Sequence, residues 1–188
     1  MPLEAGRTAG FLLVVGGIIC VLGIIVAEAL YPGYSSSGNC ISDLGVGPSS
    51  VIFNSSVFLL GVLILAGAFF IHKAFNLRVF PVLVALAGIG AVGVGIFTEK
   101  VGVIYTVFSL IVFLFGGLSA IASCKLQKLP LSWFSAILGL IVLSALTLFA
   151  TGNYLGLGKG GMERMIAYPA LLWTIAFGGY LMGKFSGK

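Results

Sequence analysis

Six long runs of apolar residues dominate the sequence. They cover about residues 9–30, 51–71, 80–98, 101–123, 132–150 and 163–183. Each run is close to the roughly 20 apolar residues that a helix needs to cross the hydrocarbon core of a bilayer. The runs are continuously apolar rather than alternating, which favours helices over the strands of a membrane barrel. The sequence therefore predicts an all-α, polytopic bundle of six transmembrane helices that forms one domain over residues 1–188.

The composition agrees with a membrane protein. Only 8% of the residues are charged, 60% are hydrophobic, and the mean hydropathy is +1.20. The first run is longer than the 7–15 apolar residues of a signal peptide, and Glu4 lies where a signal peptide would be basic, so we expect a retained helix. In a lipid-embedded chain the net charge of +5 indicates contact with anionic lipid headgroups, and no nucleic-acid partner is expected.

The distribution of basic residues predicts the orientation, because Lys and Arg concentrate in the short cytoplasmic loops of membrane proteins. With both termini in the cytoplasm, that side holds one acidic residue, Glu4, and seven of the ten basic residues, which are Arg7, Lys73, Arg78, Lys125, Lys128, Lys184 and Lys188. We therefore expect a multi-pass protein of the cell membrane with its N and C termini in the cytoplasm. The connection over residues 31–50 would then be a long, ordered extracytoplasmic loop.

Small residues at four-residue spacing predict close helix packing. Such residues let the backbones of two membrane helices approach each other. They occur in the first, third and sixth runs, at Gly6 and Gly10, at Ala87, Ala91 and Gly95, and at Gly179 and Gly183. We expect a compact bundle in which the third helix packs between two neighbours. The same glycine-rich faces also allow the protein to form a homo-oligomer.

The segment YPGYSSSGNCISDLGVGPSS, residues 31–50, is the most polar part of the chain. Pro and Gly near its start end the first helix, and a Ser near its end is a plausible N-cap for the second. In one interpretation the loop is a lid over a polar pocket, in which Asp43 pairs with Arg164 or Lys100 while Asn39 and Ser42 donate to free carbonyls at helix ends. In the other, Ser42 and Asp43 form a turn or cap a short helix.

Charged residues gather at the predicted outer ends of the helices. They are four carboxylates, Glu28, Asp43, Glu99 and Glu163, and the cations Lys100 and Arg164. A charge at a helix end ordinarily lies at the membrane interface. Glu163, at the start of the sixth helix, interacts favourably with the helix dipole. Glu28 lies at the C-terminal end of its helix, where a carboxylate opposes the dipole. It therefore requires a cationic partner, either Arg164 or Lys100.

The glycine-rich segment TGNYLGLGKGGMERMIAYP, residues 151–169, is similar to a phosphate-binding loop only in composition. A Walker motif requires Gly at position 153 and Ser or Thr at position 160, where this chain has Asn153 and Gly160. A nucleotide site is therefore excluded. Two interpretations stay open: a weaker anion site at the helix N-terminus beside Lys159 and Arg164, or a flexible loop before a helix.

The residue inventory excludes several enzyme classes. The sole histidine, His72, lies on the predicted inner side, so neither a His-ligated zinc site nor a Ser-His-Asp triad fits the outer face. The three cysteines, Cys20, Cys40 and Cys124, are too dispersed to pair, which leaves Cys40 as a free thiol or, alternatively, as an intermolecular link. We expect no metal and no cofactor, although the outer carboxylates leave Mg²⁺ or Ca²⁺ binding and acid–base chemistry unspecified.

Three segments carry a resemblance to a known family: YPGYSSSGNCISDLGVG with its Ser42-Asp43-Leu44-Gly45 core, NSSVFLLGVLIL, and GGMERMIAYPALLW. They resemble the prokaryotic six-helix membrane family catalogued as domain of unknown function nine hundred and ninety-eight, over essentially the whole chain. A more distant similarity runs to the eukaryotic six-helix family of fibroblast-growth-factor-receptor-activating and damage-regulated autophagy modulator proteins. One branch of that family remodels the lipid of GPI anchors. The resemblance implies fold and topology but no reaction.

In the prokaryotic family a His is frequent near the start of the fourth helix. This chain has Tyr105 at that place, which argues against carrying over any chemistry that depends on a histidine.

The leading functional hypothesis is that the protein binds or handles a membrane lipid or amphiphile at a polar pocket in the outer leaflet. The candidate ligand-binding residues are Glu28, Asn39, Ser42, Asp43, Glu99, Lys100, Tyr105, Lys159, Glu163 and Arg164. The alternatives are a small-solute or ion-coupled transporter and a structural or assembly subunit. Transporter sites lie near the middle of the membrane, where Asn54, Thr147 and Trp173 are the only polar candidates.

Overall fold

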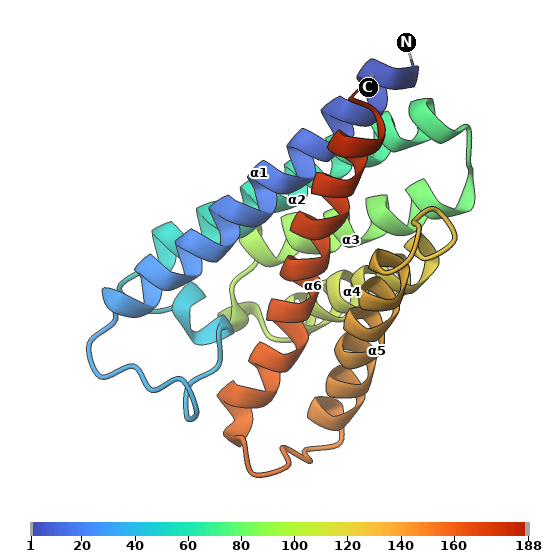
Figure 1. The fold of residues 1–188 in the computed structure, drawn as a ribbon. Helices are drawn as coiled ribbons and strands as arrows, with labels where there is room; N and C mark the ends of the chain where they lie inside the picture. The colour runs from blue at the N-terminus through green and yellow to red at the C-terminus, as the bar shows by residue number, and fades with distance from the viewer. Residues whose placement is uncertain (1, 187–188) are drawn as a thin grey trace.

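The computed structural model describes residues 2–186, and Figure 1 shows them as a bundle of helices. The long helices are α1 (Pro2–Ala29), α2 (Ser50–Phe75), α3 (Val79–Ile96), α4 (Val103–Ser123), α5 (Leu131–Ala150) and α6 (Gly158–Lys184). Two short 3₁₀ helices, η1 (Ser42–Gly45) and η2 (Glu99–Val101), lie in the connections. All six long helices are long and apolar enough to cross a membrane, and residues 2–186 contain no strand. The predicted all-α bundle is confirmed; Lys188 lies outside the described residues.

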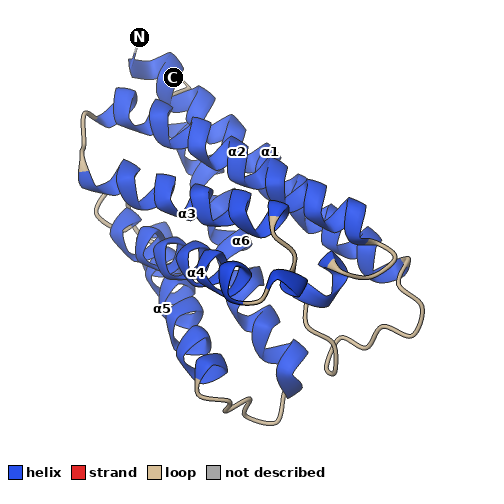
Figure 2. Cartoon of the chain, turned by 180° about the vertical axis from the view of Figure 1, so that it is seen from behind, coloured by secondary structure: helices blue, strands red, loops and turns tan. Residues whose placement is uncertain are grey.

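Both described termini lie at one end of the bundle, together with connections 76–78 and 124–130 (Figures 1 and 2). Connections 30–49, 97–102 and 151–157 lie at the opposite end, which we call the distal end. Helix α1 packs against α2 and α6, α3 packs between α2 and α4, and α5 contacts α4 and α6. Since α4 also contacts α6, the helices α1, α2, α3, α4 and α6 form a closed ring, and α5 lies outside it.

Glycines form the closest helix crossings, as the spacing predicted. A Cβ atom on Gly10 of α1 would lie 2.5 Å from the carbonyl oxygen of Gly178 in α6, and a Cβ on Gly178 would lie 2.7 Å from the carbonyl oxygen of Gly10. The position of α3 between two neighbours is confirmed. The expectation for α6 was wrong, because Gly179 and Gly183 face open space and Gly178 makes the contact instead. A homo-oligomer stays a prediction.

Helix α6 begins at Gly158 rather than near residue 163. Glycine has a low helix propensity, which is why the sequence pattern predicted a loop through residue 162. In the structure the loop before α2 packs directly on the first turn of α6, and the backbone N–H of Gly160 donates to the Ser37 carbonyl at 3.1 Å. A Cβ on Gly160 would lie only 1.9 Å from the Asn39 carbonyl oxygen. The glycines therefore permit a tertiary contact that local propensity does not reveal.

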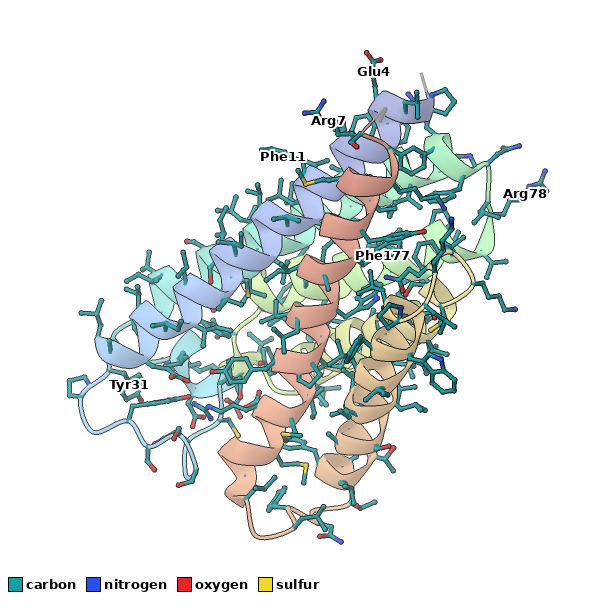
Figure 3. All side chains as sticks on the ribbon, viewed as in Figure 1. Glu4, Arg7, Phe11, Tyr31, Arg78 and Phe177 are labelled. Carbon is teal, nitrogen blue, oxygen red and sulfur yellow. The ribbon has the colours of Figure 1, made fainter. Side chains whose placement is uncertain are left out.

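Apolar side chains cover both the inside and the outside of the bundle. Phe177 is fully buried, whereas charged side chains such as Glu4, Arg7 and Arg78 gather at the end that carries the termini (Figure 3). Many large apolar side chains on the outer faces are exposed, among them Leu22, Val79 and Trp133. A surface this apolar is favourable only against lipid. The chain is therefore a multi-pass membrane protein.

Candidate functional site

Arg164, in the second turn of α6, is the centre of a hydrogen-bond network at the distal end. Its Nη2 donates to Glu28 Oε1 at 2.5 Å and to Tyr34 Oη at 2.9 Å. Its Nη1 donates to three carbonyl oxygens, those of Ser36 at 2.6 Å, Asn39 at 3.1 Å and Gly160 at 3.0 Å. The planar guanidinium suits this role because its donors point in fixed, divergent directions. One side chain thus joins α1, α6 and the loop between α1 and α2.

The pairing of Glu28 with Arg164 confirms the expectation that a carboxylate at the C-terminal end of α1 requires a cation. The side chain of Arg164 is 11% exposed and that of Glu28 is 24% exposed. A charge in such a position is stable only while its partner is present. The alternative partner, Lys100, is exposed on η2 and forms no ion pair within residues 2–186.

The loop between α1 and α2 folds back into the distal end of the ring. Cys40, Ile41, Ser42 and Leu44 are buried there. Glu163 Oε2 accepts the backbone N–H of Ile41 at 2.6 Å, which fixes the loop to α6. We call residues 40–45 the plug, because they occupy the space between the helix ends.

Asp43 does not pair with Arg164 or Lys100, so that expectation was wrong. Its Oδ2 accepts the backbone N–H of Cys40 at 2.9 Å and the Nδ2 of Asn39 at 3.2 Å. Asp43 therefore stabilises the turn that begins η1, as the alternative interpretation proposed.

The roles expected of Asn39 and Ser42 were also wrong. Asn39 donates to Asp43 rather than to a free helix-end carbonyl, and no such bond is formed by Ser42. Arg164 instead donates from Nη1 to the loop carbonyls of Ser36 and Asn39.

Most of the predicted ligand-binding residues do converge. Glu28, Asn39, Asp43, Glu163 and Arg164 belong to one continuous network, and Tyr105 lies beside Ser42. Lys159 lies next to the Cys40 thiol with an exposed side chain, and Glu99 is half-buried nearby on η2.

The proposed anion site at the start of α6 is already occupied by the protein. The backbone N–H of Gly160 donates to the Ser37 carbonyl, and the loop backbone leaves no room for another group there. The N-terminal turn of α6 therefore holds the loop.

Burial governs the chemistry of two loop side chains in this network. Burial, together with the neighbouring Glu163 carboxylate, raises the pKa of the Cys40 thiol to about 12. Burial also raises the pKa of Tyr34 to about 12, although the Arg164 guanidinium beside it acts in the opposite direction. Both side chains are neutral at physiological pH. Tyr34 and Cys40 therefore add no charge to the network.

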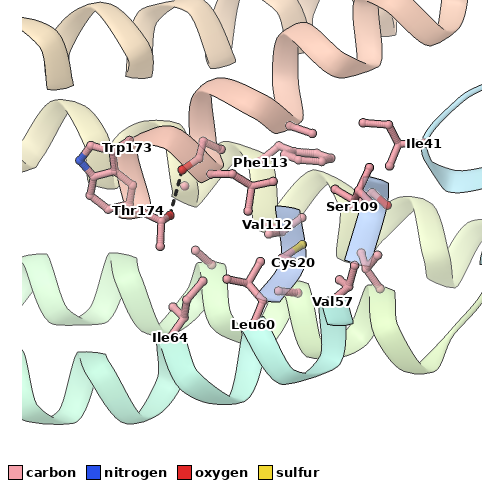
Figure 4. Close-up of a pocket in the computed structure, with 18 of the residues that line it drawn as sticks. Cys20, Ile41, Val57, Leu60, Ile64, Ser109, Val112, Phe113, Trp173 and Thr174 are labelled. Carbon is pink, nitrogen blue, oxygen red and sulfur yellow. Dashed lines mark hydrogen bonds between the residues drawn. The ribbon is translucent and has the colours of Figure 1, made fainter. Parts of the chain in front are cut away.

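A cavity of about 90 Å³ lies beneath the plug, inside the ring of helices (Figure 4). Ile41 and Ser109 lie at its distal end, and Trp173 and Thr174 lie at its deep end. Each ring helix lines the cavity with residues of its inner face. The first and last of these residues are Leu13 and Ile24 in α1, Phe53 and Ile64 in α2, Val84 and Val94 in α3, Tyr105 and Gly116 in α4, and Glu163 and Thr174 in α6. Helix α5 contributes none of the lining residues.

The cavity is long and narrow. The lining residues of α6 extend from Glu163 to Thr174, which at 1.5 Å per residue corresponds to roughly 16 Å along the helix. The lining residues of the other ring helices span similar lengths. A volume of about 90 Å³ over that length describes a slot rather than a rounded chamber.

Polar atoms are confined to a few places on the cavity wall. Glu163, Tyr105 and Ser109 border its distal end, and the Ser109 hydroxyl is buried without a hydrogen-bond partner. At the deep end, Thr174 donates to the Ala170 carbonyl at 2.9 Å, and the Trp173 indole N–H donates to Ser123 Oγ at 3.0 Å. The slot therefore has apolar walls and one polar end.

Sequence reasoning identified part of this cavity. Trp173 was among the deep candidates, but Asn54 and Thr147 do not line the slot, since Asn54 donates to the Gly45 carbonyl and Thr147 to the Leu143 carbonyl. Ser109 was missed. Its position four residues after Tyr105, on the same face of α4, was the available signal.

Residues 2–186 contain no cluster of three or more His, Cys, Asp or Glu side chains that is suited to a metal ion. The carboxylates at the distal end contact backbone N–H groups, an amide and Arg164 instead of one another.

Residues 14–180 match the protein-family model described as a protein of unknown function, DUF998. No curated protein and no solved structure matches the chain. Since the family model covers all but the two ends of the chain, the protein is a member of the DUF998 family.

Proposed function

We propose that this protein binds a membrane amphiphile by enclosing one apolar chain in the interhelical slot. The observation that carries the proposal is the slot itself, an apolar cavity with a single polar end inside a membrane-spanning bundle. Ligand sites of this kind are mostly apolar and hold a few polar groups that orient the ligand. The length of the slot, roughly 16 Å, matches an extended alkyl chain. The polar end of the amphiphile would then lie beneath the plug.

The proposal changes the role expected for Arg164. Its two terminal nitrogens donate to five oxygen atoms of the protein, so the guanidinium is not free to hold a lipid headgroup. We assign to Arg164 the anchoring of the loop that closes the slot. The exposed Lys100 and Lys159 are left to contact headgroups at the membrane surface.

Gly116 offers a direct test of the slot. It is buried, lines the deep end, and a Cβ atom built on it would meet nothing within 4 Å, so a larger side chain there would enter the cavity. We therefore propose Gly116→Leu as a variant that fills the slot without a clash at its Cβ. Gly179→Leu is the matched control, because Gly179 is also helical with open space at its Cβ but is exposed on the outside of α6.

Native mass spectrometry of the purified protein provides the measurement. We expect a retained amphiphile in the wild type and in Gly179→Leu, and its loss in Gly116→Leu. Equal retention in all three would place the amphiphile on the outer surface. Its absence from all three would contradict the proposal, and uptake of a small solute by liposomes containing the protein would then favour a transporter.

We further propose that the distal end faces the outside of the cell. The support is the concentration of Lys and Arg in the connections at the opposite end. Gly38→Cys and Lys128→Cys place thiols at exposed sites on opposite ends of the bundle. On intact cells, a membrane-impermeant maleimide should label Gly38→Cys and leave Lys128→Cys unlabelled until the membrane is permeabilised. The reverse pattern would invert the orientation.

A further inference from the structure

We propose that the distal end of the slot selects an amphiphile whose head group donates hydrogen bonds, a hydroxyl or an ammonium, over one that ends in phosphate or carboxylate. This inference rests on the proposed function and names the class of ligand. It is drawn from three features of the wall: the Glu163 carboxylate, the Ser109 hydroxyl, and the absence of a cation from the lining residues.

Glu163 supplies an acceptor with spare capacity. Its Oε2 accepts the backbone N–H of Ile41, the carboxylate also accepts from the Cys40 thiol and the Ser42 backbone N–H, and the side chain borders the cavity. An ionised carboxylate has two oxygens with about four acceptor sites and no donor. A ligand hydroxyl or ammonium can therefore add a hydrogen bond without displacing the loop. An ionised carboxylate and a doubly ionised phosphate monoester have no hydrogen to offer.

Ser109 supplies an unused polar group at the same end. Within residues 2–186 its Oγ is buried and makes no hydrogen bond of good geometry, although the Tyr105 side chain lies beside it and also lines the slot. Leaving a buried hydroxyl unpaired is costly, so a ligand group that bonds to it contributes to binding. A hydroxyl or ammonium between Ser109 and Glu163 could satisfy both side chains.

Cations lie outside the slot. Arg164 directs its donors to Glu28, Tyr34 and loop carbonyls, and Lys159 is exposed at the rim. An anionic head group inside the slot would lose its hydration and would face the Glu163 carboxylate without a compensating positive charge. The wall thus disfavours anions, because no cation among the lining residues compensates for their desolvation.

Trp173 provides a reporter at the far end of the slot. The chain has two tryptophans, and Trp133 is exposed on α5, so Trp133→Phe leaves Trp173 as the only indole. Trp173 is 4% exposed and lines the slot, which shields it from molecules dissolved in the surrounding lipid or detergent. It lies ten residues after Glu163 on α6, or roughly 15 Å along the helix. A chain whose head is at Glu163 can therefore bring its tail to Trp173.

The probes are undecyl chains with a terminal bromine, which quenches indole fluorescence on contact. They carry an alcohol, an amine, a carboxylate or a phosphate at the other end. In Trp133→Phe we expect the alcohol and the amine to reach half-maximal quenching at about tenfold lower concentration than the two anions, a difference of about 1.4 kcal/mol. Gly116→Leu in the same background should abolish quenching by every probe.

Two variants test whether Glu163 causes the discrimination. Glu163→Gln keeps an acceptor for the Ile41 N–H but removes the charge, so the preference for the amine over the anions should fall several-fold. Glu99→Gln makes the same change at the distal end on a residue that does not line the slot, and it should leave the ranking unchanged. If Glu163→Gln does not fold, Ser109→Ala provides the second test, with weaker quenching by the alcohol expected.

The outcomes separate this inference from the proposed function. If the anionic probes quench Trp173 as strongly as the alcohol and the amine, or more strongly, the head-group assignment is overturned. Binding of the chain in the slot would then still hold. If no probe quenches Trp173, and native mass spectrometry finds no amphiphile, the proposed function fails as well.

Discussion

Replacing Arg164 by alanine should release the loop between α1 and α2 while the helices stay folded. The substitution removes five hydrogen bonds and leaves the Glu28 carboxylate without its partner. Breaking a buried ion pair costs about 3–5 kcal/mol. Since the Glu28 side chain is 24% exposed, water can partly replace the partner, and we expect the lower end of that range, about 3 kcal/mol.

Hydrogen exchange measures this loss locally. Residues 34–41 belong to the loop, and the Ile41 N–H donates to Glu163. Because exchange follows local opening and each 1.4 kcal/mol is a factor of ten, a cost near 3 kcal/mol predicts exchange about 10²-fold faster in this segment. Peptides from the middle of α2 and α3 should exchange at the wild-type rate.

Arg164→Lys separates charge from geometry. An ammonium can pair with Glu28 but does not reach the loop carbonyls with the fixed fork of a guanidinium. We expect exchange in residues 34–41 at a rate between those of the wild type and Arg164→Ala. If Arg164→Ala leaves the protection of this segment unchanged, the loop is held by its other contacts and the anchoring role of Arg164 is refuted.

Three further predictions concern single contacts. Gly160→Ala places a Cβ atom against a loop carbonyl, so it should lower stability by about 2 kcal/mol and Tm by roughly 4–8 °C. The control Gly161→Ala, whose nearest contact is a side chain, should change Tm little. Equal effects of the two variants on Tm would contradict the contact. Cys40, with its pKa raised to about 12, should resist maleimide at neutral pH in the folded protein, and rapid labelling would refute its burial. Ser123→Ala leaves the buried indole N–H of Trp173 unpaired and should lower the free energy of unfolding by about 1–3 kcal/mol, measured by thermal unfolding in detergent.

The fold was predictable because one physical requirement dominates it. Apolar runs long enough to cross a bilayer must be helical, since lipid offers no partners for backbone N–H and C=O groups. The packing of α3 between two neighbours followed from its small residues. The contact surface of α6 did not, because Gly178 and Gly179 are adjacent in the sequence and only the rotation of the helix decides which one meets α1.

The ion pair in the candidate site was predictable from the helix dipole, which disfavours Glu28 without a cation. The choice of Arg164 over Lys100, and the role of Asp43 within its own turn, depend on where the loop backbone runs. The two loop carbonyls that meet Arg164 and the one backbone N–H that meets Glu163 carry no signal in the sequence, since nearly every residue has both groups.

The slot could not be predicted as a cavity, although Tyr105, Glu163 and Trp173 of its wall were named as candidates. Its wall is made of residues such as Leu13, Val84 and Gly116, which are indistinguishable in the sequence from the close-packed core around them. A cavity depends on the volume left between five helices. That volume follows from side-chain packing in three dimensions, and a one-dimensional pattern does not record it.

Anomalous diffraction from crystals soaked with the bromine-terminated undecyl alcohol would test the central claim most directly. If the slot holds an extended chain with its hydroxyl beside Glu163 and Ser109, the bromine peak should lie inside the ring of helices next to Trp173. Bromine peaks confined to the outer, lipid-facing surface of the bundle, with only water in the slot, would contradict it.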